Sequence, residues 1–325
     1  MLIRDEIQAL RSNDAPQRHA QAELALTHER WCAGARYQAI EAEMQRYGAG
    51  EALDRLPVLA DLFTPGSSAA RDLLDGLFGV LLAELRARPF GQVPLRHFCN
   101  ARLASLLIAS VGSVGLVVQS IDGAGLRRRD PFLTASFPPG ETWEHVLAGT
   151  GEAELLEIVG RRPGGVELQR RPCSLAPGTV NRRDGSRESL MHLSIPTSLV
   201  LLKLQRRVEG GAVAREYRLS DGVQLHQASA SLSESRLELA AALLGRMGRS
   251  DAAPLLAAMA EEHGGDSLRW QSLRECLALD SRTGFVTLCR IAARADDPLS
   301  GPAGALRAQL LETYPQLKEA AACQG

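Results

Sequence analysis

Lysine is nearly absent from this sequence. Two of its 37 basic residues, Lys203 and Lys318, are lysines and the others are arginines. We interpret this bias as coding bias in a bacterial protein and not as a sign of function. The six cysteines lie far apart, without a CxxC pair. Their spacing argues against a zinc finger and against a scaffold held together by disulfide bonds.

Neither a strong net charge nor a long apolar run is present. The 37 basic and 38 acidic residues give a formal net charge of −1, which is not typical of a chain that binds nucleic acid or a membrane surface. No apolar stretch approaches the roughly 20 residues that cross a bilayer. Residues 1–6 lack the basic start and apolar run of a signal peptide. We therefore expect a cytoplasmic protein with neither a nucleic-acid nor a membrane partner.

Helix-forming sequence occupies the N-terminal part of the chain. We expect helices over residues 14–47, 51–63 and 69–88, where alanine, glutamate, arginine and leucine are frequent. Gly34 weakens the first of these helices and Pro57 interrupts the second.

Short helices return after Ala230, joined by turns rich in glycine and aspartate. The first carries Leu237, Ala240, Leu244 and Met247 at helical spacing, which predicts one apolar face. The segments LLGRMGRSDAAPLLAAMAEE and LRWQSLRECLAL resemble the helix pairs of HEAT-type repeats. This resemblance covers residues 233–315 and implies a surface for a protein partner.

Between these helical parts, the sequence consists of short runs bounded by Gly, Pro, Asp or Ser. We expect about ten short strands, as in an antiparallel sandwich or barrel. No long helices separate these runs, which argues against a parallel βαβ sheet. The chain then divides into a helical segment of residues 1–100, a β-barrel of residues 101–230 and a helical domain of residues 231–325.

Two segments of the strand-rich part carry a motif. Residues 139–149 read PGETWEHVLAG, and residues 176–180 read APGTV. The first resembles the glycine-bounded histidine and glutamate motif of the cupin superfamily, and the second resembles its Pro-x-Gly motif. The resemblance implies an α+β protein with a cupin-like antiparallel β-barrel or sandwich, flanked by the N-terminal helical segment and the HEAT-like helical bundle. It also implies a homodimer, since cupins pair through strand exchange or sheet packing.

The metal ligands of the cupin family are matched only in part. The first segment has one histidine where the family shows two, and no histidine follows Pro177-Gly178. Glu141, His145 and His192 are the candidate ligands, with His97 in reserve. They would hold a divalent iron, manganese, nickel or zinc ion, because such an ion takes about three imidazole and carboxylate ligands.

Strand alternation gives the direction of these side chains. Glu141, Trp143 and His145 lie on one face of their strand and Glu144 lies on the other. We expect the face of Glu141 and His145 to line the barrel interior. The ordinary alternative is that each histidine is a surface or hydrogen-bonded core residue.

Two functions remain open from the sequence. In the first, the protein is a binding or interaction protein: the barrel holds a small ligand or acts as a scaffold, and the C-terminal helices contact a protein partner. In the second, it is a metal-dependent cupin-type enzyme, a non-haem dioxygenase or an isomerase. The sequence leaves open whether the protein is an enzyme.

Overall fold

The computed structural model describes residues 10, 12–128, 132–208, 212–262 and 264–317. The chain forms two compact units. Unit 1 takes residues 1–135, 140–207 and 219–222, and unit 2 takes residues 136–139, 208–218 and 223–325. The three segments expected from the sequence stay a prediction. Residues 1–6, where the sequence predicts no signal peptide, lie outside the described part. Within that part, no helix is both long and apolar enough to cross a membrane.

The N-terminal helices begin and end close to where the sequence predicts. Gly34 separates the first long helical segment into two helices, and Pro57 opens a short helix of its own. At the start of the next helix, the hydroxyl oxygen of Ser67 accepts a hydrogen bond from the backbone N–H of Ala69. The helices are α2 (Ala15–Cys32), α3 (Ala35–Gly48), α4 (Pro57–Asp61) and α5 (Ala69–Ala87), with a single 3-10 turn, η1 (Leu53–Arg55).

A six-stranded antiparallel sheet is the centre of unit 1. Its strand order is β1-β2-β3-β10-β5-β8, so β10, which comes late in the sequence, pairs with both β3 and β5. The strands are β1 (His97–Cys99), β2 (Leu103–Val111), β3 (Val114–Asp122), β5 (Gly140–Ala148), β8 (Val180–Asp184) and β10 (Ser198–Arg207).

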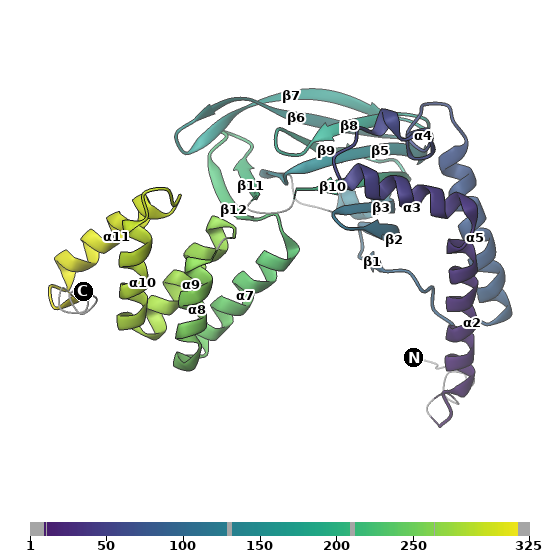
Figure 1. Ribbon diagram of the computed structural model, residues 1–325. Coiled ribbons are helices and arrows are strands. Elements are labelled where there is room, and N and C mark those ends of the chain that lie inside the picture. The colour runs from purple at the N-terminus through teal and green to yellow at the C-terminus, as the bar shows by residue number, and fades with distance from the viewer. Residues whose placement is uncertain (1–9, 11, 129–131, 209–211, 263, 318–325) are drawn as a thin grey trace. The chain divides into compact units, whose positions relative to one another are not determined.

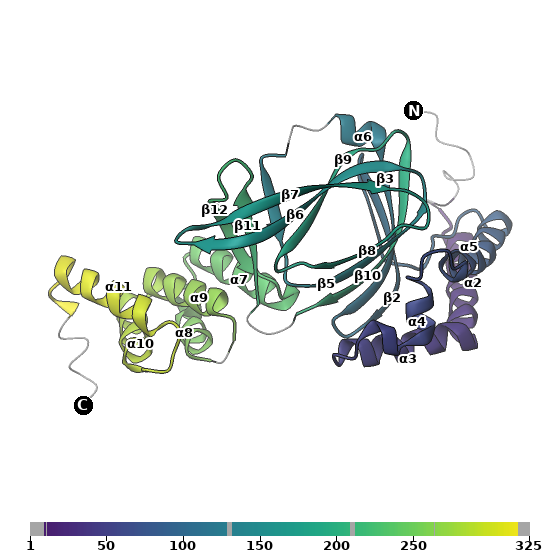
Figure 2. The same cartoon turned by 90° about the horizontal axis from the view of Figure 1, so that it is seen from above.

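A second sheet, in the order β7-β6-β9, faces the six-stranded sheet (Figure 2). Its strands are β6 (Gly151–Arg162), β7 (Gly165–Leu175) and β9 (Glu188–Ser194), and the short helix α6 (Gly123–Arg127) follows β3. A third sheet, β12-β11-β4, consists of β4 (Thr134–Phe137), β11 (Val213–Arg218) and β12 (Gln224–Ser229). The described residues thus form twelve strands in three sheets, and the protein is an α+β protein with a β-sandwich and helical segments on both sides of it in sequence.

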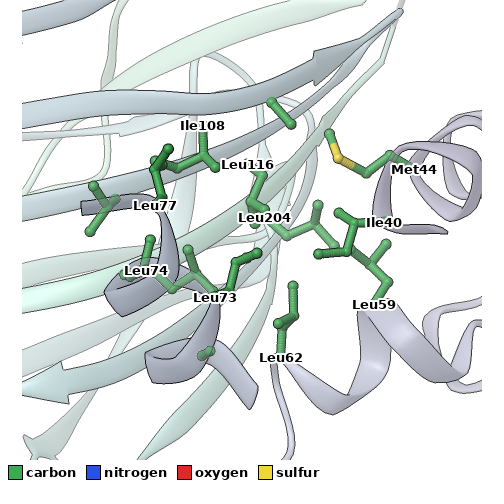
Figure 3. Packing of buried hydrophobic residues seen from close by; sticks show 14 of the residues in the cluster. Ile40, Met44, Leu59, Leu62, Leu73, Leu74, Leu77, Ile108, Leu116 and Leu204 are labelled. Carbon is green, nitrogen blue, oxygen red and sulfur yellow. The ribbon is translucent and has the colours of Figure 1, made fainter. Parts of the chain in front are cut away.

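The N-terminal helices cover the outer face of the six-stranded sheet (Figure 1). Leucines of α5 meet Ile108, Leu116 and Leu204 of the sheet, while Ile40 and Met44 of α3 pack beside them (Figure 3). These side chains are almost fully buried. Each contributes about 1.5–3 kcal/mol by leaving water, so this contact is a main source of stability of the unit.

Unit 2 contains the C-terminal helices, in which α9 packs against α7, α8 and α10. The face that the spacing predicts as the core side of the first helix is not buried: Leu237 and Met247 are exposed, and among the described side chains of α7 it is Ala241 that is buried. The structure establishes helices here and leaves the HEAT-type assignment a prediction. They are α7 (Leu232–Arg246), α8 (Ala253–Glu261), α9 (Asp266–Leu279), α10 (Ser281–Ala293) and α11 (Ser300–Thr313), with a 3-10 turn η2 (Ser250–Ala252).

Candidate functional site

Glu141 and His145 point in the same direction, as strand alternation predicts, but not into the sandwich. Both lie on the face of β5 that packs against the N-terminal helices, since Tyr47 and Leu62 of that helical part are their partners. The expectation that they line the interior is therefore wrong. The reason is that Leu202 and Leu204 of β10 make this face apolar, and the N-terminal helices bury it.

Glu141 is fully engaged by the residues around it. Tyr47 donates its hydroxyl hydrogen to Oε2 at 2.8 Å, Arg206 pairs with the same oxygen at 2.7 Å, and Arg182 pairs with Oε1. Burial alone would raise the pKa of Glu141, but the hydrogen bonds from Arg182 and Tyr47 outweigh it and lower that pKa. Burial raises the pKa of Tyr47, and the hydrogen bond to Glu141 raises it further. Glu141 thus links α3 to the sheet.

His145 is a buried residue with a backbone partner. Its Nδ1 lies 2.8 Å from the carbonyl oxygen of Leu62. Because a carbonyl oxygen only accepts, Nδ1 carries the hydrogen in this contact. The imidazole therefore fixes the end of the short α4 segment against β5.

The other two candidate ligands lie elsewhere. His192 is on β9 of the second sheet. His97 is on β1, with β2, β3 and β10 between it and β5, which puts the two strands about 19 Å apart at the usual strand spacing. Among the described residues, no group of three or more His, Cys, Asp and Glu could hold a metal ion. Metal binding by these four residues stays a prediction from the sequence.

The opposite face of β5 carries a different set of residues. Glu144 lies directly across from Lys203 of β10, and Arg183 of β8 reaches the same carboxylate. Lys203 Nζ is 2.7 Å from Oε1 of Glu144 and Arg183 Nη1 is 2.5 Å from its Oε2. We call these three side chains the interior triad, because their face of the sheet turns toward β6, β7 and β9.

The interior triad is removed from water. The Glu144 side chain is 2% exposed, and those of Arg183 and Lys203 are 11% and 15% exposed. Burial alone would raise the pKa of Glu144, but the two cations more than offset it and hold that pKa far below the usual carboxyl range. Glu144 is therefore an anion at neutral pH.

The charges of the interior triad do not cancel. Two cations share one carboxylate, and within the described part of the chain neither cation has a second carboxylate within 4.0 Å. One positive charge is thus left over in a place where water is largely excluded. Such a charge is costly unless a counter-ion or a hydrogen-bond acceptor meets it.

Two amide side chains extend the triad across the same face. Gln119 of β3 pairs with Leu201, two residues from Lys203, and Asn181 of β8 pairs with Glu144. Among the described residues, the buried Oε1 of Gln119 and the buried Nδ2 of Asn181 have no hydrogen-bond partner. Buried polar atoms nearly always have a partner, so these two mark a place where a polar ligand or water would bind.

Apolar side chains continue this face on one side of the triad. Val146 of β5 and Leu201 of β10 meet Ala153 and Leu175 of the second sheet in a buried cluster. The interior of the sandwich is therefore apolar at one end and charged at the triad. We define the polar row as the interior triad together with Gln119 and Asn181.

The sequence held one signal for the polar row. Lysine is rare in this sequence: Lys203 is one of two lysines among the 37 basic residues. It lies in the interior triad. Strand alternation correctly predicts that Glu144 lies on the opposite face of β5 from His145, but it does not predict the cations that pair with Glu144. That partner depends on the pairing of β5 with β10 and β8, which local pattern does not give.

No protein-family model and no curated protein matches the chain. Solved structures that match part of it include a cupin superfamily protein from Desulfitobacterium hafniense, 13% identical, over 34% of this chain and 83% of that one, with a TM-score of 0.24. KdgF from a Halomonas species is 15% identical over 35% and 88% of the two chains, with a TM-score of 0.24. Oxalate decarboxylase from Lactobacillus farciminis is 13% identical over 41% and 38%, with a TM-score of 0.27. At these TM-scores the likeness carries no argument about function.

Proposed function

We propose that the protein binds a small anionic molecule and that the polar row holds it. One observation carries the proposal: Arg183 and Lys203 share a single buried carboxylate, which leaves one positive charge without a counter-charge among the described residues. An anionic ligand would supply that charge. Charge-assisted hydrogen bonds of this kind are among the strongest that a protein makes.

The two amides narrow the class of ligand. The Gln119 oxygen requires a donor and the Asn181 amide nitrogen requires an acceptor. A hydroxyl group is both. We therefore propose a small carboxylate that also carries a hydroxyl group, with its carboxylate near Lys203 and its hydroxyl near an amide.

Isothermal titration calorimetry with malate and succinate tests this class directly. The two dicarboxylates differ by one hydroxyl group, so we expect malate to bind about 2- to 10-fold more tightly, which is the usual contribution of one hydrogen bond. Equal binding of both would exclude the role of the amides, and binding of neither would exclude this ligand class.

Two arginine variants separate the polar row from general surface charge. Arg183→Gln removes an interior charge, whereas Arg182→Gln removes the neighbouring charge on the opposite face of β8. Arg183→Gln leaves Glu144 paired with Lys203, so the fold is kept. We expect malate affinity to fall about tenfold or more in Arg183→Gln and to stay unchanged in Arg182→Gln. The reverse order would contradict the proposal.

A protein partner for the C-terminal helices is a second, separate proposal. Its support is the exposed apolar face of α7, where Leu239 is 73% exposed and Leu243 and Met247 are each 58% exposed. These residues follow one another at four-residue spacing on one face of the helix. We propose that this face pairs with the same face of a second copy of the chain.

A further inference from the structure

A pocket in unit 2 has no part in the function proposed above. It has a volume of about 540 Å³ and lies among α9, α10, α11 and the turn after α11. This volume is within the range of pockets that bind small molecules, roughly 300–1,000 Å³. Its lining includes Arg274, Leu277, Ala278, Phe285, Leu306 and Leu310.

The lining is mostly apolar and rests on a rigid core. Phe285 is fully buried in the cluster that holds α9, α10 and α11 together, and Leu277, Leu306 and Leu310 pack against that cluster. The pocket floor is therefore preformed. Apolar walls of this kind favour an aliphatic group, at about 0.8 kcal/mol per buried CH₂.

One charged group stands in the lining. Arg274 is exposed and forms no ion pair within the described residues. Its guanidinium is thus available to an anion at the edge of an apolar surface. An apolar wall with a cation at its edge is complementary to an amphipathic anion.

We propose that this pocket binds an aliphatic monocarboxylate. Its chain lies against Leu277, Phe285 and Leu310, and its carboxylate pairs with Arg274. A partner helix fits the pocket less well, because helix-in-groove recognition takes apolar anchors over two or more helical turns, and a volume of about 540 Å³ is that of one compact ligand.

Calorimetric titration of the full chain with decanoate and with decan-1-ol tests the proposal. The two probes share an alkyl chain and differ in charge. We expect Arg274→Gln to weaken decanoate about fivefold, the usual effect of losing a partly exposed ion pair, and to leave decan-1-ol unchanged. Equal decanoate affinity in Arg274→Gln and in the natural protein would overturn the assignment of Arg274.

A second pair of variants locates the binding. Ala278 lies in the lining and Ala308 lies outside it, and both are exposed helical residues. Tryptophan at an exposed alanine leaves the fold intact, so Ala278→Trp fills the pocket while Ala308→Trp serves as the matched control. We expect the first to abolish binding of both probes and the second to leave it unchanged. Decanoate binding that survives Ala278→Trp, or that is lost in Arg183→Gln, would overturn the proposal by placing the ligand elsewhere.

Discussion

Glu141 and Glu144 lie three residues apart on β5 and have opposite surroundings. Glu141 faces the N-terminal helices and binds Tyr47 and two arginines, whereas Glu144 faces the second sheet and binds Lys203 and Arg183. The difference follows from the alternation of a strand, in which odd and even residues point to opposite faces. The charge of Glu144 is the residue-scale feature on which ligand binding depends.

Glu144→Gln tests the energetic role of that charge. The substitution leaves two buried cations without a carboxylate, so we expect the free energy of unfolding at pH 7 to fall by about 3–5 kcal/mol. Chemical denaturation measures this loss. Glu167→Gln, an exposed glutamate outside any ion pair of the described residues, serves as the control and changes stability by less than about 0.5 kcal/mol.

The pH dependence of the same variant has a definite sign. The pKa of Glu144 is lowered by folding, so its stabilising contribution is complete above the ordinary carboxyl value of 4.5 and is lost as the pH falls below it. The stability difference between the natural protein and Glu144→Gln should therefore shrink between pH 5 and the acid limit of about pH 2–3. A constant difference over this range would contradict the ionised state of Glu144.

At the scale of elements, α5 shows how an amphipathic helix covers a sheet. Leu77 is fully buried against the six-stranded sheet, and Leu82, one and a half turns further along, is 49% exposed. The sequence predicts this helix over residues 69–88, and the structure confirms its bounds within one residue. The N-terminal helices thereby cover the face that carries Glu141 and His145.

Leu77→Ala and Leu82→Ala form a matched pair on this helix. We expect Leu77→Ala to lower the free energy of unfolding by about 2–5 kcal/mol, because it leaves a cavity in a packed core. Leu82→Ala should change it by less than about 0.5 kcal/mol. Thermal or denaturant unfolding of the two variants compares them, and equal losses would show that α5 does not pack on the sheet as described.

The exposed apolar face of α7, formed by Leu239, Leu243 and Met247, can be tested as a contact between two copies of the chain. If it pairs two copies of the chain, sedimentation velocity should show a mass that rises with concentration, and Leu239→Glu with Leu243→Glu should keep the protein monomeric. Charged side chains at these positions would have to be buried without partners in such a contact. A natural protein that stays monomeric up to high concentration would exclude this partner.

Local features of the sequence predicted local features of the structure. Gly34 separates α2 from α3 and Pro57 begins α4, both through their own backbone chemistry, and the alternation from Glu141 to His145 needs only one strand. Which face of that strand is interior depends on where the N-terminal helices pack, and the partners of Glu144 depend on residues 39 positions or more away. The buried side of α7 was missed because it packs through Ala241, whose short side chain lets α9 approach closely.

At the scale of the whole molecule, metal analysis decides between the two functions that the sequence left open. The binding-protein account predicts that His145→Ala leaves the metal content of the purified protein unchanged, because His145 already donates to a backbone oxygen and Glu141 is held by two arginines. Stoichiometric iron, manganese, nickel or zinc that is lost in His145→Ala would support a metal-dependent enzyme instead.

The central claim is that the surplus positive charge of the interior triad binds an anion. A crystal structure of the full chain with malate tests it most directly. We predict a carboxylate oxygen of malate within hydrogen-bond distance, about 2.7–2.9 Å, of Lys203 Nζ or an Arg183 nitrogen. Malate bound only away from the polar row, or an unoccupied polar row at saturating malate, would contradict the account.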